Sequence, residues 1–146
     1  MIKLKPSYDQ SLILDDWISC YWEAYWGVFE LKRTLNKEDK LNKKETRSLI
    51  TKHRIGHSVS NSLIKRAILN GEAFFSRSNG KGRVQEIGSE EAFCELSGLG
   101  VKIDKYIVDL PVIGAVICQR HDCVGGEVAR IRRTIDRDYY LEFLCS

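Results

Sequence analysis

Three residues in the C-terminal part of the chain, Cys118, His121 and Cys123, carry side chains that bind zinc in proteins. A tetrahedral zinc site needs four soft or imidazole ligands, so a fourth would have to come from a distant residue such as Cys94 or Cys145. The spacing also lacks the paired Cys-x-x-Cys pattern of a zinc knuckle. We interpret the group as free thiols beside a loop, with a zinc-stabilised domain as the alternative, and we expect no bound metal or cofactor.

Two further candidate ligands, His53 and His57, are four residues apart and flank a predicted turn. No cysteine or acid stands near them at a matching spacing, so we interpret them as surface or phosphate-contacting residues. The chain has no HExxH motif, no nucleophile elbow and no Gly-Lys-Ser/Thr phosphate loop. We therefore expect that the protein is not an enzyme.

Positive charge is concentrated in one part of the chain. The net charge is only +3, but residues 32–83 contain 14 Lys or Arg and 4 Asp or Glu, a local balance of +10. Residues 1–31 balance at −3 and residues 84–146 at −4. A basic helix face is often merely solvated, but here the charge coincides with predicted DNA-binding elements. We therefore expect a nucleic-acid-binding protein.

The basic segment is predicted to begin with two helices joined by a short turn. Asn42 and Glu45 have the spacing of a capping box, which favours a helix over residues 43–55. Gly56 favours the end of that helix. A second amphipathic helix is predicted over residues 59–70.

The second helix is predicted to end at Gly71 and to lead into a hairpin over residues 74–83. Asn79-Gly80 favours a two-residue hairpin turn, because both residues tolerate a positive φ. The order of helix, turn, helix and hairpin is that of a winged helix–turn–helix. The expected fold class is therefore mainly α with a small β-hairpin.

These elements supply candidate contacts to double-stranded DNA. Small polar residues at the start of a recognition helix can approach base edges, which favours Ser60 and Asn61. Exposed arginines on a narrow hairpin suit a wing. The candidate phosphate-contacting cations of this segment are Lys43, Arg47, Lys65, Arg66, Arg77, Lys81 and Arg83. The alternative is an amphipathic helix whose polar side is simply solvated.

The strongest predicted helix covers residues 15–35, where aromatic and aliphatic side chains recur every three or four residues. They are Trp17, Ile18, Tyr21, Trp22, Tyr25, Trp26, Phe29 and Leu31. Such a face is typical of a core helix. The alternative is a partly exposed aromatic surface that binds a protein partner, since Trp and Tyr are favoured at interfaces.

The C-terminal part contains a glycine-led segment at residues 123–131 and a Tyr139-Tyr140 pair within residues 136–144. Together with residues 103–111, these segments resemble the C-terminal helix–turn–helix of sigma-factor-like regulators. Phage late-gene antiterminators of the Q type carry such an arrangement. The resemblance implies a recognition helix that contains the tyrosine pair, and a transcription regulator that engages RNA polymerase.

The same residues also fit a β-hairpin. Arg132 stands where the pattern has an apolar residue, and Arg133 stands where its turn has glycine. Residues 139–146 alternate across an Asp136–Asp138 turn as a hairpin would. In either case the segment supplies a second basic group and two candidate base contacts: Arg130, Arg132, Arg133, Arg137, Tyr139 and Tyr140.

Residues 89–96 predict a further helix, and residues 101–110 and 112–118 are either helices or buried strands. We expect residues 1–100 to hold the aromatic helix and the winged-helix-like region. Residues 101–146 would hold the C-terminal segment, with one continuous domain as the alternative.

The cysteine content and the absence of long apolar runs bear on location. Five scattered cysteines fit reduced thiols better than a disulfide framework. The first residues lack the apolar core of a signal peptide, and no run of about 18 apolar residues occurs. We expect a cytoplasmic, sequence-specific DNA-binding transcription regulator without a membrane segment. The alternative is a non-enzymatic protein-interaction module that docks through its aromatic helix.

Overall fold

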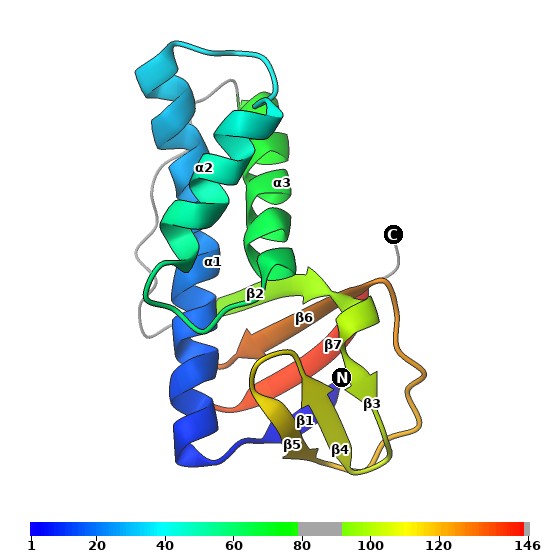
Figure 1. Cartoon of the computed structure of the whole chain (residues 1–146). Coiled ribbons are helices and arrows are strands. Elements are labelled where there is room, and N and C mark those ends of the chain that lie inside the picture. The colour runs from blue at the N-terminus through cyan, green and yellow to red at the C-terminus, as the bar shows by residue number, and fades with distance from the viewer. Residues whose placement is uncertain (79–91, 145–146) are drawn as a thin grey trace.

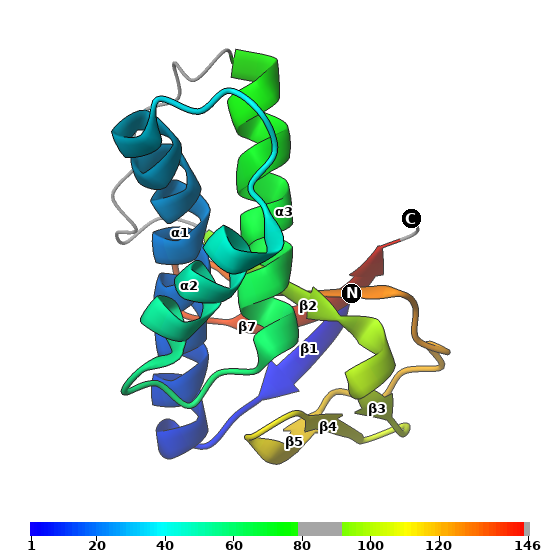
Figure 2. The ribbon, with the colours of Figure 1, turned by 45° about the horizontal axis from the view of Figure 1, so that its top comes forward.

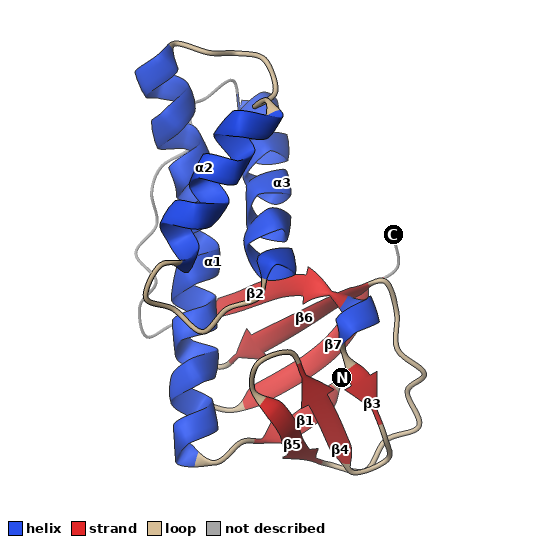
Figure 3. Ribbon diagram, viewed as in Figure 1, coloured by secondary structure: helices blue, strands red, loops and turns tan. Residues whose placement is uncertain are grey.

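Three helices and one seven-stranded antiparallel sheet make up the part of the chain that the computed structural model describes, residues 1–78 and 92–144 (Figure 1). The helices stand together at one end of the sheet, and one of them continues along its side (Figure 3). The expected mainly α fold with a small hairpin is therefore wrong. The protein has a mixed α and β fold, because long-range strand pairing organises most of the residues from Ala92 onward.

Helix α1 (Tyr8–Leu35) begins seven residues before the predicted start. Ser7 and Gln10 form a capping box there, in which the Ser7 hydroxyl accepts from the Gln10 amide. The core interpretation of its aromatic face is confirmed for Trp17 and Phe29, which are buried, as are several of their neighbours. Burial of a face this wide makes α1 the element against which the other helices and the sheet pack.

Helix α2 (Lys43–Arg54) begins at the predicted capping box. The Glu45 amide donates to Asn42 Oδ1 at 2.8 Å, and the Asn42 amide donates to Glu45 Oε1 at 2.9 Å. The helix lies across α1 and α3 (Asn61–Ser78), as both views show (Figure 2). The local sequence therefore suffices to place the start of α2.

Helix α3 continues past Gly71, so the predicted helix end at that glycine is wrong. Gly71 is buried where α3 meets α1, and a Cβ there would lie 2.6 Å from the Tyr25 carbonyl oxygen. The glycine thus permits close approach of two helices rather than ending one. Residues 74–78 are helical, so Arg77 lies in the last turn of α3 and not in a wing. Lys81 and Arg83 lie outside the described residues.

The sheet has the order β2-β6-β7-β1-β5-β4-β3, and every neighbouring pair is antiparallel. Its strands are β1 (Ile2–Lys5), β2 (Ala92–Ser97), β3 (Lys102–Ile103), β4 (Ile107–Leu110), β5 (Gly114–Cys118), β6 (Val128–Arg133) and β7 (Tyr139–Leu144). Strands from residues 1–100 and from residues 101–146 thus share one sheet.

Buried side chains form rows across the sheet. Ile2 is opposite Leu141 and Leu141 is opposite Ile131, which in turn is opposite Cys94. All four are buried, and they cross four neighbouring strands. The helix predicted over residues 89–96 is therefore wrong from Ala92 onward, because this segment pairs with β6 over six residues.

The C-terminal helix–turn–helix is also wrong, and the hairpin alternative is correct. Strands β6 and β7 pair from Val128 to Arg133, and the Thr134 amide donates to the Asp138 carbonyl at 2.9 Å across the turn. Arg137 takes a φ of 64° in that turn. The alternation with a period of two, rather than the likeness to a recognition helix, decided the local structure.

None of the described helices combines the length and the apolar character needed to cross a bilayer.

Substitution of Gly71 by alanine tests the contact between α1 and α3. Alanine favours a helix over glycine by about 1 kcal/mol, but its Cβ would meet the Tyr25 carbonyl. We expect Gly71→Ala to lower the free energy of unfolding by about 1–3 kcal/mol in urea titrations. Ser76→Ala, at an exposed position of the same helix, is the control and should change it little. A stabilised Gly71→Ala variant would contradict the close approach.

Candidate nucleic-acid interface

The outward face of α2 carries the largest group of exposed cations on any helix of the described chain. Leu49 is buried, and Ile50 and His53 are half-buried toward the other helices. With a period of 3.6 residues, this orientation places the remaining long side chains outside. The exposed cations of this face are Lys43, Lys44, Arg47, Lys52 and Arg54.

The single acid of α2, Glu45, does not pair with these cations. Glu45 accepts from the Asn42 amide at 2.9 Å and from the Lys37 ammonium at 2.5 Å. The hydrogen bond from Lys37 lowers the pKa of the Glu45 carboxyl, so the group stays ionised. Glu45 is therefore committed to the cap and to Lys37.

Four of the cations have no counter-charge in the described part of the chain. Lys43, Lys44, Arg47 and Lys52 make neither an ion pair nor a hydrogen bond there, whereas Arg54 donates from Nε to the Val59 carbonyl at 3.3 Å. We call these four residues the α2 cation group. Their charges act outward, because nothing described neutralises them.

The same face is hollowed by a shallow groove. Its lining combines cations with hydroxyl donors and one exposed apolar residue: Lys44, Arg47, Ser48, Thr51, Lys52 and Ile55. Ammonium, guanidinium and hydroxyl groups are the donors that contact phosphate oxygens in nucleic-acid complexes. Sequence reasoning missed Ser48 and Thr51. Ser48 lies one turn from Lys44 and Lys52, and Thr51 lies one turn from Arg47, so their places on the exposed side of α2 were a usable signal.

The predicted DNA-contacting residues on and beside α3 are only partly exposed as a set. Ser60 is half-buried and its hydroxyl accepts from the Leu63 amide at 3.4 Å, which makes it a helix cap rather than a base contact. Asn61 and Lys65 are exposed, one turn apart. The guanidinium of Arg77 is exposed and lies 5.7 Å from the ring centre of Phe74. Asn61, Lys65 and Arg77 thus remain available to a ligand.

Arg66 and Arg130 belong instead to a network inside the fold. Arg66 Nε lies 3.2 Å from Glu95 Oε1, and Arg130 Nη2 lies 2.8 Å from Glu95 Oε2. Asn70 donates to the same carboxylate at 3.2 Å and to the Tyr21 hydroxyl at 2.7 Å. These bonds join α3 to β2 and β6 and use both guanidinium groups as structural partners of a buried acid.

The electrostatics of Glu95 reflect two opposed effects. Its side chain is only 5% exposed. Burial by itself raises the pKa of Glu95, but the hydrogen bonds from Arg130 and Arg66 outweigh that effect, and the pKa lies below its ordinary value. The carboxylate is therefore ionised at neutral pH.

Arg133, Arg137 and Tyr139 gather around a second acid, Asp15 on α1. Arg133 and Arg137 reach its two oxygens at 2.9 and 3.3 Å, and the Tyr139 hydroxyl donates at 2.5 Å. Burial, then the hydrogen bond to Asp15, raises the pKa of Tyr139 to about 12. This cluster fastens the C-terminal hairpin to α1, so these three side chains already serve a structural purpose.

Tyr140 points to the opposite face of the sheet from Tyr139 and is half-buried between Lys3 and Arg132 in register. Arg132 Nη2 lies 3.2 Å from Glu142 Oε1. The arginines of the predicted second basic group therefore form ion pairs with Glu95, Glu142 and Asp15. The structure does not bring them together with the α2 cation group.

The metal-type residues considered above also separate into two sets. Cys118 is buried in β5, whereas Cys123 is exposed and its amide donates to His121 Nδ1 at 3.1 Å. Their ligand atoms do not form a metal-compatible group, whereas those of His57, Asp16 and Cys20 do within the described residues. Sequence spacing missed this second set, because Asp16 and Cys20 stand about forty positions from the histidine.

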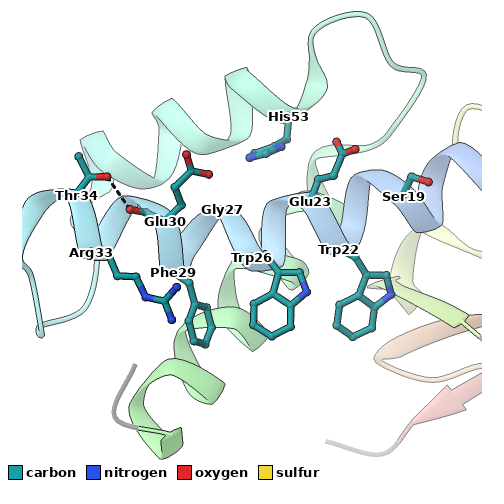
Figure 4. Close-up of a pocket in the computed structure, with 10 residues that line it drawn as sticks. All are labelled: Ser19, Trp22, Glu23, Trp26, Gly27, Phe29, Glu30, Arg33, Thr34 and His53. Atoms are coloured by element: carbon teal, nitrogen blue, oxygen red, sulfur yellow. Dashed lines mark hydrogen bonds between the residues drawn. The ribbon is translucent and has the colours of Figure 1, made fainter. Parts of the chain in front are cut away.

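An aromatic groove runs along α1 (Figure 4). It is lined by Ser19, Trp22, Glu23, Trp26, Gly27, Phe29, Glu30, Arg33, Thr34 and His53. Aromatic rings lie on one side of the helix and Glu23, Glu30 and His53 on the other (Figure 4). Trp22 Nε1 donates to the Phe93 carbonyl at 2.7 Å, whereas Trp26 Nε1 is enclosed without a hydrogen-bond partner in the described chain. The partly exposed rings of Trp22 and Trp26 in this groove support the protein-partner alternative.

Substitution of Glu95 by glutamine tests the inward role of Arg66 and Arg130. Glutamine keeps the shape but removes the charge that faces Arg66 and Arg130, although Arg130 keeps Glu142 at 3.7 Å. We therefore expect the free energy of unfolding at pH 7 to fall by about 1–3 kcal/mol. In the native protein the folded pKa is depressed, so this stabilisation is present above the ordinary value of 4.5 and is lost as the pH falls through the folded pKa.

Denaturant titrations between pH 7 and pH 3 measure both effects. Glu95→Gln should flatten the pH dependence below 4.5, whereas Glu127→Gln, at an exposed position, should not. Equal pH profiles for the two variants would show that Glu95 is not the acid that these arginines stabilise.

Comparison of the sequence with protein-family models gave no match, and comparison with curated protein sequences gave none either. The function is therefore inferred from geometry and charge.

Proposed function

We propose that the protein binds double-stranded DNA through the outward face of α2. One observation carries the proposal: four exposed cations, the α2 cation group, face outward without a counter-charge in the described chain. Other candidate cations, such as Arg66 and Arg133, are held by acids of the fold. The α2 cation group is therefore the largest cluster of basic charge in the described chain that a polyanion can use, with Lys65 and Arg77 of α3 as further exposed cations.

The dimensions of this face fit a duplex backbone. With a rise of about 1.5 Å per residue, Lys43 to Lys52 spans roughly 14 Å of helix. Duplex DNA presents one phosphate charge per about 1.7 Å of its axis, so several phosphates lie within reach of such a face. The hydroxyl groups of Ser48 and Thr51 supply uncharged donors between the cations. Electrostatic contact with phosphates, rather than base readout, would dominate the affinity.

As a further step, we propose that this DNA binding regulates transcription. The resemblance to sigma-factor-like regulators depended on residues that form the β6–β7 hairpin. We therefore rest the proposal on charge and not on a recognition helix in that segment. Within α3, Asn61 is the exposed residue whose amide suits a base edge, and it is the residue to which we assign sequence preference.

The second candidate function is binding of a protein partner in the α1 groove. The observation that favours it is that the partly exposed rings of Trp22 and Trp26 line this groove. Tryptophan is enriched at the centres of such interfaces. This function needs no salt-sensitive affinity for DNA, which separates the two candidates experimentally.

Fluorescence anisotropy with a labelled duplex over a salt series tests the leading proposal. If the four cations each neutralise one phosphate, log K should fall with log[salt] with a slope of about −3.6. Lys44→Ala/Arg47→Ala should reduce the magnitude of that slope by about 1.8 and weaken binding at low salt. The expected cause is the loss of two phosphate contacts.

Lys102→Ala/Lys105→Ala is the matched control, since it removes the same charge from exposed positions near β3. It should leave the slope almost unchanged. Equal effects of the two double variants would mean that net charge and not the α2 face binds the duplex. Absence of salt-sensitive binding in the native protein would reject the DNA proposal in favour of the α1 groove.

A further inference from the structure

Three potential metal ligands from two distant parts of the chain meet beside α1. Asp16 and Cys20 are one helical turn apart on α1, and His57 lies in the turn between α2 and α3. One ligand atom of each lies within 4.8 Å of the other two. His57 Nδ1 is 3.0 and 2.9 Å from the two Asp16 oxygens. The imidazole is thus already directed at the carboxylate.

The turn that carries His57 is held in place by hydrogen bonds. The His57 amide donates to the Arg54 carbonyl at 3.0 Å, and Trp17 Nε1 donates to the Ser58 carbonyl at 2.7 Å. Gly56 has a φ of 77°, which permits the tight reversal. Because Trp17 is itself buried, these contacts fix the distance between His57 and the α1 residues.

The ligand types indicate which cation would bind. A thiolate, an imidazole and a carboxylate suit zinc, whereas magnesium and calcium prefer oxygen alone. Zinc lies about 2.0 Å from nitrogen or oxygen and about 2.3 Å from sulfur, so tetrahedral ligand atoms are roughly 3.3–3.7 Å apart. The ligand atoms lie within 4.8 Å of one another, so shifts of about 1 Å would bring them to that spacing. Three protein ligands leave one position for water, as in zinc sites that are open to solvent.

We propose that Asp16, Cys20 and His57 bind one zinc ion. On binding, the Cys20 thiol releases its proton to solvent and the thiolate sulfur forms a bond to zinc, while the neutral imidazole and the Asp16 carboxylate each donate an electron pair. No redox change occurs. The thiolate and the carboxylate together balance the charge of the cation.

The surroundings of Cys20 agree with this exchange. The residue is buried, with the carboxylates of Asp16 and Glu23 near it on α1. The negative charges of these two carboxylates attract a divalent cation.

The zinc site is independent of the proposed DNA contact. It lies between α1 and the turn after α2, whereas the α2 cation group occupies the solvent side of that helix. A bound ion would join α1 to the segment between α2 and α3.

Metal titration of the purified protein, first stripped of metal with a chelator, tests the proposal. We expect one zinc per chain by elemental analysis after dialysis. We also expect cobalt to bind at the same stoichiometry and to give a thiolate-to-cobalt charge-transfer band. His57→Ala, a partly exposed and therefore tolerable change, should lower zinc affinity by about 100-fold or more, since even indirect partners of ligands cost 10–100-fold. Cys20→Ser should remove the band.

The matched control is His121→Ala/Cys123→Ser, which removes the same two side-chain types from the other candidate group. It should leave the stoichiometry and the band unchanged, with circular dichroism confirming that each variant is folded. Loss of the band in this control but not in His57→Ala would overturn the proposal. So would a native protein that binds no zinc, because Asp16 and His57 would then form only an ion pair.

Discussion

Burial of the aromatic face of α1 is the constraint on which the rest of the structure depends. Along that helix, Trp17 donates to the turn after α2, Trp22 donates to β2, and Asp15 receives the hydroxyl of Tyr139. Each bond accompanies apolar burial, so the polar groups are satisfied at the same contacts that exclude water. The two candidate sites and the aromatic groove depend on this packing, because among the described elements α2 packs mainly against α1 and α3.

Arginine and lysine play different parts in this molecule. The cations bound to Glu95 and Asp15 are all arginines, and their planar guanidinium groups can serve two elements through one carboxylate. Three of the four members of the α2 cation group are lysines, which are strongly hydrated and remain outside. A count of basic residues along the chain therefore overstates the charge that a ligand meets. Pairing with an acid, rather than residue type, separates the two parts: Lys32 is buried beside Glu72, whereas Arg47 is exposed and has no acid partner in the described chain.

Local signals in the sequence predicted what local physics decides. The capping box of Asn42 and Glu45 marked the start of α2 correctly, and the spacing of the α1 aromatics marked a core helix. The prediction of a helix end failed at a glycine, because glycine can either end a helix or permit close packing of two helices. Glycine often ends a helix, but Gly71 instead allows α3 to approach the Tyr25 carbonyl closely. The strands failed for another reason: β2 owes its conformation to pairing with β6, more than thirty residues away. The group of Asp16, Cys20 and His57 could not be found from spacing, since only the packing of α1 against the α2–α3 turn brings it together.

Charge is compensated inside the fold but left uncompensated on the outer face of α2, and the cost of desolvation explains the difference. Inside the fold an uncompensated charge is expensive, so Glu95 and Asp15 are surrounded by donors, and a zinc ion beside α1 would meet two anionic ligands. On the outer side, water and salt screen an unpaired lysine within about 8–10 Å, so leaving it unpaired costs little. Four such cations on one short helix still sum to a field that reaches approaching polyanions. Exposure of a single lysine would carry no functional meaning, but four cations on one short helix, whose own acid Glu45 is engaged by the cap and by Lys37, are the basis of the proposed DNA contact.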